Sequence, residues 1–165
     1  MMFNFNAAEV FQIAINIEEN GKKFYDKALA IVDDQAVKDL FMDLGLQEVD
    51  HKKRFEALKA QLPPEVQKAT VWDPDNETDL YIKMMADQHV FTAADSVEKA
   101  LATVKNAMDA LKMAIEFEKD SILFFLSMLE VADSKKDQDL INLLVKEEQT
   151  HLRRLSLELA RLRRA

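Results

Sequence analysis

The sequence predicts an all-α protein, a four-helix bundle made of two helical hairpins that are joined by a long crossover. The 165 residues include only 2 Gly and 3 Pro, and sheets and hairpin turns depend on such residues. All three prolines lie in one stretch, between Pro63 and Pro74. On both sides of this stretch the apolar residues recur at helical spacing, and part of the first half returns in the second at an offset of 100 residues.

The first hairpin is expected over about residues 7–62. An apolar face with a period of 3.6 residues predicts a helix that runs to about Val32. Asp33 or Asp34 can cap the N-terminus of the second helix, which should end near Leu62, before a proline pair.

The crossover is expected over about residues 63–104. Its first part is rich in turn residues and is predicted to be irregular, whereas 80–91 and 96–104 have the spacing of short helices. A simple up-down-up-down bundle needs no connection of about 40 residues, but a return across helices about 40 Å long does. The second and third long helices should therefore be parallel.

The second hairpin is expected over about residues 105–165. Its helices should cover about 104–131 and run from about Gln138 to the end, with a turn at "ADSKKD" between them. Residues 1–165 are then expected to form a single domain.

The internal repeat concerns polar residues as well as apolar ones. The segment "AINIEENGKKFY" starts at Ala14, and "AIEFEKDSILFF" starts at Ala114. The residues Asp39, Leu40, Leu44, Glu48, His51 and Arg54 recur as Asp139, Leu140, Leu144, Glu148, His151 and Arg154. A duplicated helical hairpin explains this offset, and it predicts two halves related by a pseudo-twofold axis.

Two pairs of glutamates should meet across the hairpins. Residues of an antiparallel hairpin lie at one level when they are equally far from its turn. The midpoints of Glu18 with Glu48, and of Glu118 with Glu148, both fall inside the predicted turns. Each pair is therefore expected to lie at one level of its own hairpin.

Two of the three histidines follow a glutamate by three residues, as Glu48-x-x-His51 and Glu148-x-x-His151. This spacing places both side chains on one helix face, here an apolar one. Buried carboxylates and imidazoles are costly unless they are paired, and two divalent cations would balance four carboxylates. The sequence thus predicts a site for two metal ions, iron or manganese. The expected ligands are Glu18, Glu48, His51, Glu118, Glu148 and His151.

Neighbouring residues have weaker claims to this site. Glu19 matches Lys119 in the repeat, which is typical of a solvated face, and so Glu18 is preferred as the ligand. Glu147 is expected beside the ligands or on the surface. Tyr25, two turns from Glu18, is either a core tyrosine or an auxiliary catalytic residue, which would donate to a carboxylate ligand or be a redox-active neighbour of the metals. Its counterpart in the repeat is a phenylalanine, so any such role is asymmetric. His89 lacks an upstream glutamate and is interpreted as structural.

The segments "IEENGKKFY", "EVDHKKRF", "FEKDSILFF" and "EEQTHLRRL" resemble the rubrerythrin-type members of the ferritin-like di-metal carboxylate family. The resemblance covers nearly the whole chain. It implies a ferritin-like fold, a cofactor of two iron ions with manganese or a mixed pair as alternatives, and reduction of peroxide or oxygen. Rubrerythrins usually carry a rubredoxin domain with a Cys-ligated iron. This sequence has no Cys, so electrons are expected from a separate donor protein.

One position departs from the family pattern. Rubrerythrins often have an additional carboxylate three residues before the third-helix glutamate, where this sequence has Ile115. Glu116 is adjacent but should point off the face. The six-residue set is closer to that of symmetric ferroxidase sites. A ferroxidase or iron-handling protein therefore stays an alternative, as does a metal-stabilised binding module without turnover.

Charge and hydropathy restrict the partners. A formal net charge of -8 argues against nucleic-acid binding. No apolar run reaches the roughly 18 residues that would span a bilayer, and no basic leader is recognisable, so a cytoplasmic protein is expected. We also expect a homodimer or a larger homo-oligomer.

Overall fold

The computed structural model describes residues 7–64, 77–89, 95–130, 132 and 134–165. These residues form six α-helices and no strand, which confirms the predicted fold class. The four long helices are α1 (Ala7–Ala28), α2 (Gln35–Ala60), α5 (Ala107–Met128) and α6 (Lys135–Leu162), and the two short ones are α3 (Glu77–Gln88) and α4 (Ser96–Leu101). None of the described helices is both long and apolar enough to cross a bilayer.

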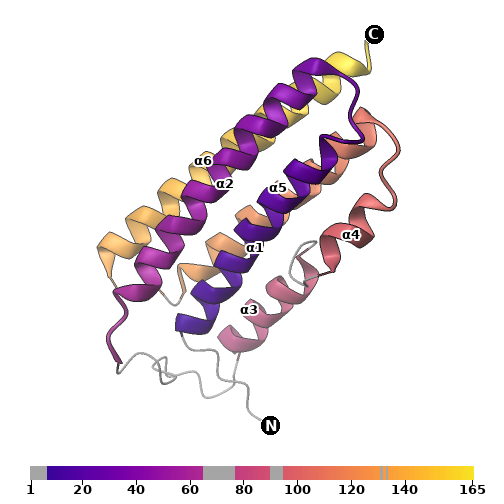
Figure 1. Ribbon diagram of the computed structural model, residues 1–165. Helices are drawn as coiled ribbons and strands as arrows, with labels where there is room; N and C mark the ends of the chain where they lie inside the picture. The colour runs from indigo at the N-terminus through magenta and orange to yellow at the C-terminus, as the bar shows by residue number, and fades with distance from the viewer. Residues whose placement is uncertain (1–6, 65–76, 90–94, 131, 133) are drawn as a thin grey trace.

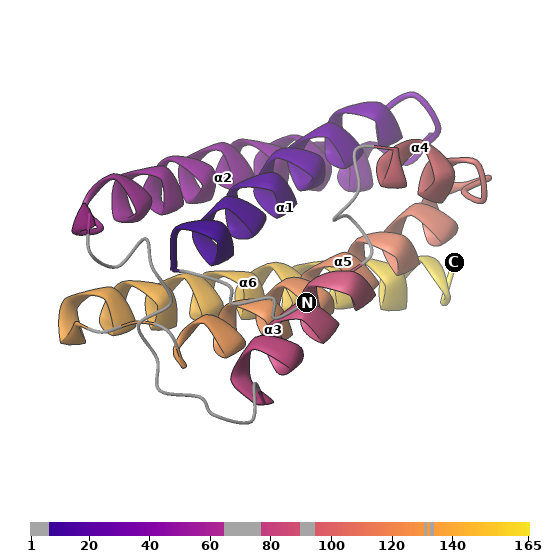
Figure 2. The same cartoon turned by 90° about the horizontal axis from the view of Figure 1, so that it is seen from below.

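The long helices form a bundle of two antiparallel hairpins. In Figure 1, α1 and α6 run in one direction and α2 and α5 in the other. The two helices on either side of the crossover are therefore parallel, as its length predicted. Figure 2 shows the hairpins as two layers, α1 with α2 and α5 with α6. The crossover helix α3 packs on α5, and α4 packs on α1.

Side-chain caps set where α2 and α6 begin. Asp34 accepts a hydrogen bond from the Val37 amide at 3.0 Å, as expected for one of the two candidate caps. Ser134 accepts from the Asp137 amide at 3.0 Å, so α6 begins at Lys135, three residues before the predicted Gln138. The polar segment "ADSKKD" was expected to be a turn, and the serine cap within it was not predicted.

The other long helices are shorter than predicted. The α1 helix ends at Ala28 rather than near Val32, because the amides of Ala30 and Ile31 bond only three residues back, in tight turns. Asn106 caps α5, which begins at Ala107. The crossover contains the two expected short helices, whereas 65–76, most of its predicted irregular part, lies outside the described residues.

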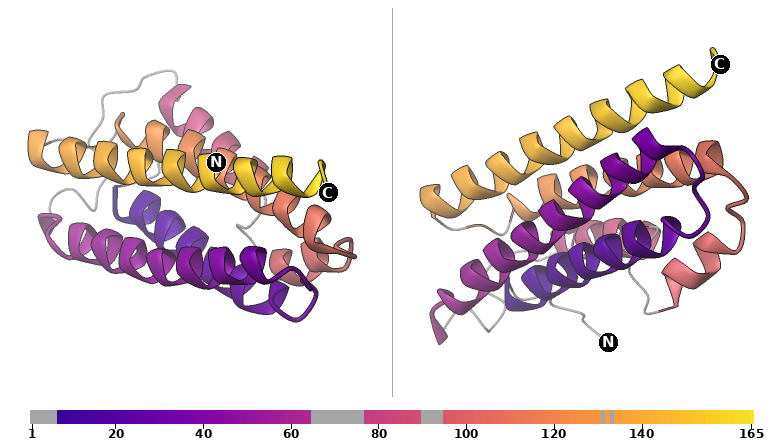
Figure 3. Two further views of the ribbon diagram at one scale, coloured as in Figure 1. Left: turned by 90° about the horizontal axis from the view of Figure 1, so that it is seen from above. Right: turned by 45° about the horizontal axis from the view of Figure 1, so that its top comes forward.

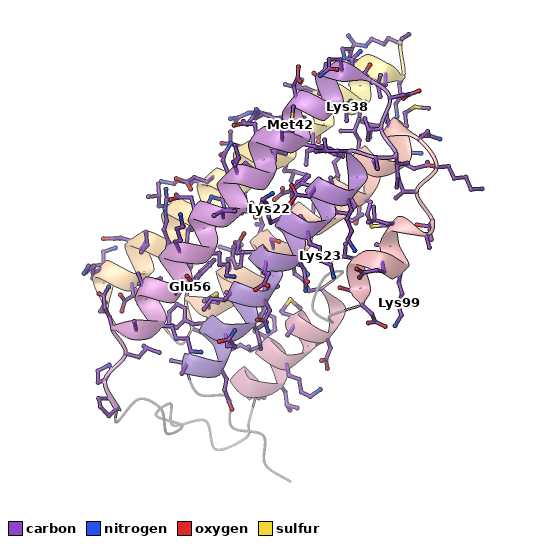
Figure 4. The ribbon with its side chains drawn as sticks, viewed as in Figure 1. Lys22, Lys23, Lys38, Met42, Glu56 and Lys99 are labelled. Carbon is purple, nitrogen blue, oxygen red and sulfur yellow. The ribbon has the colours of Figure 1, made fainter. Side chains whose placement is uncertain are left out.

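Ion pairs connect the hairpins and the crossover at the surface. The Arg161 guanidinium, near the end of α6, lies 2.6 Å from the Asp34 carboxylate at the start of α2. Lys23 and Lys27 of α1 lie 2.8 and 2.5 Å from the same Glu98 oxygen of α4, and Figure 4 shows Lys23 on the side of α1 that faces α4. These exposed pairs contribute little stability individually, and they indicate the register of the helices.

Apolar side chains pack between the two layers of helices, whose long axes can be followed in Figure 3. Phe55 of α2 and Phe125 of α5 are fully buried, with ring centroids 4.8 Å apart. On α1, Gly21 lies directly against Phe117 of α5, because a Cβ atom at Gly21 would come within 2.4 Å of Phe117 Cζ. The glycine therefore allows α1 and α5 to approach closely one turn beyond Glu18.

Candidate metal centre

The structure brings together all six residues that the sequence predicted as ligands. They come from all four long helices: Glu18 from α1, Glu48 and His51 from α2, Glu118 from α5, and Glu148 and His151 from α6. Each is at most 1% exposed. Such burial is rare for carboxylates, and it occurs here because the duplicated register places each glutamate on the apolar face of its helix.

Within the described residues, the six side chains form two overlapping groups of possible ligands. One group contains Glu18, Glu48, His51 and Glu148, and the other contains Glu48, Glu118, Glu148 and His151. In each group one ligand atom per residue can be chosen so that all lie within 4.8 Å of one another. We call these the first and the second metal position. Glu48 and Glu148 belong to both, which is the arrangement that two bridging carboxylates would have.

The inward-facing atoms have the chemistry of a ligand set. Nine of these buried atoms have no aligned hydrogen-bond partner within the described part of the chain. They are Nδ1 of both histidines, both oxygens of Glu18, Glu48 and Glu148, and Oε2 of Glu118. His51 Nδ1 lies only 2.6 Å from Glu148 Oε1, but without the alignment that a hydrogen bond requires. Buried polar atoms of this kind are normally paired or coordinate metals. The residues present therefore fit two divalent cations.

The pKa values show how strongly these groups influence one another. Burial raises the pKa of Glu18, Glu48 and Glu118 well above the ordinary value. Burial also opposes ionisation of Glu148, but the two histidines outweigh it and lower the pKa of that carboxyl. Burial likewise opposes protonation of His51, and the Glu148 charge overcomes it and raises the pKa to about 9. Among protein groups alone the cluster therefore holds protons, which metal binding would have to displace.

The outer nitrogen of each histidine has a partner on the opposite hairpin. His51 Nε2 lies 2.9 Å from Glu147 Oε2, and His151 Nε2 lies 2.9 Å from Gln47 Oε1. Because these oxygens accept, each Nε2 carries the proton and each Nδ1 faces the carboxylates. Arg54 donates to both oxygens of Glu147, at 3.0 and 2.9 Å. The two rings lie almost parallel, with centroids 5.3 Å apart and an interplanar angle of 11°.

Tyr25 contacts the cluster from one side only. Its hydroxyl donates to Glu118 Oε1 at 2.5 Å. Burial, followed by the Glu118 charge, raises the pKa of the phenol well above its ordinary value, so the hydroxyl stays protonated. Of the two interpretations of Tyr25, the geometry favours a hydrogen bond to a candidate ligand. Phe125, its counterpart, offers no hydroxyl and packs against Phe55.

Several nearby polar residues lie outside the cluster. Glu19 is on the surface, 3.0 Å from Lys52 Nζ. Glu116 pairs with Lys119 at 2.8 Å on the exposed face, as expected, and half-buried Ile115 offers no oxygen. His89, at the end of α3, is buried, with its Nε2 3.1 Å from Ser121 Oγ.

Sequence reasoning missed some of the supporting residues. Gln47 was not among the candidates, although a histidine that binds a metal normally donates its outer N–H to an acceptor. The signal was nevertheless present, since Gln47 and Glu147 occupy equivalent positions of the repeat, each directly before a glutamate of the cluster. The contact between His89 and Ser121 had no local signal, because the crossover determines it.

The fold and the cluster together define a class, the helical bundles that bind two metals through carboxylates and histidines. The family model for rubrerythrin matches residues 9–159. The chain therefore belongs to the rubrerythrin family. A similar solved structure is that of a protein from Thermotoga maritima, described as a candidate ferritin-like diiron-carboxylate protein. It is 21% identical over 98% of each chain, with a TM-score of 0.69, and at this identity it supports the fold. No curated protein matches the sequence significantly.

Proposed function

We propose that the protein is a di-iron carboxylate oxidoreductase that reduces hydrogen peroxide or oxygen with electrons from a separate donor protein. One observation carries the proposal: Glu48 and Glu148 belong to both metal positions, within a cluster that is almost completely buried. Two redox metals bound there would supply two electrons without leaving the site. Reduction of one peroxide consumes two electrons and two protons and yields two water molecules.

The residues of the chain bind, orient and shield. Glu18 and His51 would complete the first metal position, and Glu118 and His151 the second. Fully buried apolar side chains, Ile17 and Leu44 among them, restrict the access of water, which strengthens the electrostatic interactions inside. The Tyr25 hydroxyl donates to one oxygen of Glu118, Oε1, whereas the other oxygen, Oε2, has no aligned partner among the described residues.

Electrons have to come from outside these residues. The 165 residues contain no cysteine and hence no site for a Cys-ligated iron of the rubredoxin type. A donor that docks on the surface would serve this purpose. A homodimer or a larger homo-oligomer also belongs to this proposal, as does the assignment of iron rather than manganese.

A ferroxidase is the second candidate, and Ile115 favours it. The position that often holds an additional carboxylate in rubrerythrins is apolar here, and Glu116 is occupied with Lys119 on the surface. The remaining six residues form a nearly symmetric set. Such a site would oxidise ferrous iron with oxygen and then release the product.

Metal analysis followed by anaerobic oxidation tests the proposal. Protein produced in iron- and manganese-replete medium should contain two metal ions per chain. After anaerobic reduction of the iron form, one equivalent of peroxide should oxidise the centre, and an added reductant should restore it over many cycles with the metal retained. Oxidation by oxygen with continuous uptake and release of iron would favour the ferroxidase instead. A protein that takes up no metal on reconstitution would refute both.

A further inference from the structure

The two metal positions have equivalent ligands but different supporting contacts. His51 is supported by a carboxylate, that of Glu147, whereas its counterpart His151 is supported by a neutral amide, that of Gln47. A carboxylate that accepts the outer N–H of a histidine increases the electron donation of the inner nitrogen more than an amide does. His51 is therefore the stronger metal ligand of the two.

The surrounding charges preserve this difference. Behind His51, Glu147 is held by Arg54, which also pairs with Asp50 at 2.6 Å, so that two carboxylates meet one guanidinium. One negative charge remains in excess. The pairing with Arg54 reduces the pull of Glu147 on the ring proton but leaves the anion in direct contact with the ring.

On the outer side of His151, the carboxylate of Asp43 does not contact the ring directly, because Gln47 lies between them. Gln47 donates to Asp43 at 3.1 Å, and Asp43 pairs with Arg154 at 2.7 Å, so this group is neutral. Because the carboxylate of Asp43 can only accept, the amide nitrogen of Gln47 faces Asp43 and its carbonyl faces His151. The orientation of the glutamine is thus determined by its own contacts.

A second contact acts in the same direction. The Tyr25 hydroxyl donates to Glu118 Oε1, and this bond withdraws electron density from a ligand of the second position. Glu18, the equivalent ligand of the first position, has no aligned donor among the described residues. The second position therefore has a weaker histidine and a weaker carboxylate.

We propose that the two positions are inequivalent: the first, with Glu18 and His51, retains its cation more tightly than the second, with Glu118 and His151. Glu147 and Gln47 are the positioning residues that determine this order. The inference rests on the proposed function in that it assumes a two-metal site. It adds that the second position is the one that loses its metal first and fills last.

The exchange of Glu147 and Gln47 tests the proposal, with Co²⁺ as a probe that air does not readily oxidise at this kind of site. Crystals of the parent grown with one equivalent of Co²⁺ should show more anomalous scattering beside His51 than beside His151. Glu147→Gln should weaken the tighter of the two binding steps by about 10- to 100-fold, and Gln47→Glu should strengthen the weaker step. In the double variant Glu147→Gln/Gln47→Glu, the preferred position should move to His151.

Glu56→Gln is the matched control. It removes the same charge from an exposed position of α2 (Figure 4), where the nearest cation is Lys52 at 3.9 Å. Both Co²⁺ binding steps should be unchanged in this variant. A merely structural effect of Glu147→Gln would lower the melting temperature, but it could not reverse the order of filling when Gln47→Glu is added.

Three outcomes decide the matter. A preference for His51 that reverses in the double variant supports the inference. Equal occupancy in the parent, or an order that the exchange leaves unchanged, overturns it, and the peroxide assay then shows separately whether the proposed function survives. A parent that binds no Co²⁺ overturns both the inference and the metal centre.

Discussion

The two hairpins contribute equally to the metal centre and unequally to its surroundings. Each provides one single glutamate and one Glu-x-x-His pair, at positions 100 residues apart in the sequence, and all six side chains are buried. Around them the equivalence ends. On α1, Gly21 makes room for Phe117, whereas its counterpart Ser121 on α5 contacts His89 of the crossover.

The crossover is one source of this asymmetry. It occurs once in the chain, so its helix α3 can cover α5 while α1 is contacted by α4. Residues that face the metals are equivalent in the two halves because both positions need the same ligands. Residues that face the crossover have different neighbours and therefore different identities.

The largest effect should come from the two shared carboxylates. Glu48→Ala and Glu148→Ala each remove a ligand from both metal positions, so metal content should fall from two per chain to well below one in either variant. Peroxide-driven oxidation should be lost as well. Metal analysis after reconstitution measures this. The unliganded Glu48→Ala protein should gain stability, since burial makes this carboxyl costly to ionise and its removal ends that cost.

Glu19→Ala is the control for this prediction. Glu19 is adjacent to Glu18 but lies on the surface, so the variant should retain two metals and change the free energy of unfolding by less than about 0.5 kcal/mol. Metal loss in Glu19→Ala with retention in Glu48→Ala would refute the helix register on which the site is built. Unequal losses in Glu48→Ala and Glu148→Ala would show that only one of them bridges.

The next largest effect concerns the crossover, where His89 should make the stability of the protein depend on pH. Burial lowers the pKa of this histidine from 6.5 to about 3. Between these values the unfolded chain takes up a proton that the folded protein does not, so stability falls as the pH falls. The loss should amount to roughly 2 kcal/mol between pH 6 and pH 4. Unfolding of metal-free parent and His89→Gln at several pH values measures the difference in slope, and identical slopes would contradict the assignment.

A smaller effect tests the close approach on the α1 side. Gly21→Ala should destabilise the protein by about 1–3 kcal/mol, because the new methyl group meets the rigid ring of Phe117. Gly45→Ala is the comparison, since its Cβ would lie 3.3 Å from the Tyr25 Cβ, which is tight but requires only a small shift. Alanine also has the higher helix propensity. Chemical denaturation should rank Gly21→Ala as the more damaging, and the reverse order would show that α1 and α5 are less close than the structure has them.

These comparisons also show what the sequence could predict. The parallel arrangement of α2 and α5 followed from the length of the crossover, and the meeting of the six residues followed from the offset of the repeat. Both are consequences of chain geometry. The early start of α6 was missed because Ser134 lies among polar residues that are equally typical of a turn.

The supporting contacts were harder to predict. An outer partner for each histidine could be expected from chemistry alone, but its identity depends on the rotation of α2 against α6. Gln47 contacts the histidine of the other hairpin, not the one on its own helix. The contact of His89 with Ser121 depends on the path of the crossover, which no periodicity in the sequence reports.

The smallest effect should come from Tyr25→Phe, which makes the two hairpins alike at this position. The change removes the hydroxyl that donates to Glu118 Oε1 and leaves the buried ring in place. Loss of this hydrogen bond should destabilise the metal-free protein by about 1 kcal/mol. At the same time Glu118 regains a lone pair for the second metal position, so the weaker Co²⁺ binding step should tighten by a few-fold. Calorimetric titration and thermal unfolding measure the two effects.

Tyr81→Phe is the matched control, because Tyr81 lies on α3 and is 40% exposed. The same loss of a hydroxyl there should change stability by less than about 0.5 kcal/mol and leave both binding steps as they are. Tyr25→Phe should thus lower stability while it raises the affinity of the weaker metal-binding step. This combination distinguishes a tyrosine that contacts a ligand from one that only fills the core. If stability and the weaker binding step fall together, Tyr25 supports the second position instead of weakening it, and the two hairpins differ less than their contacts indicate.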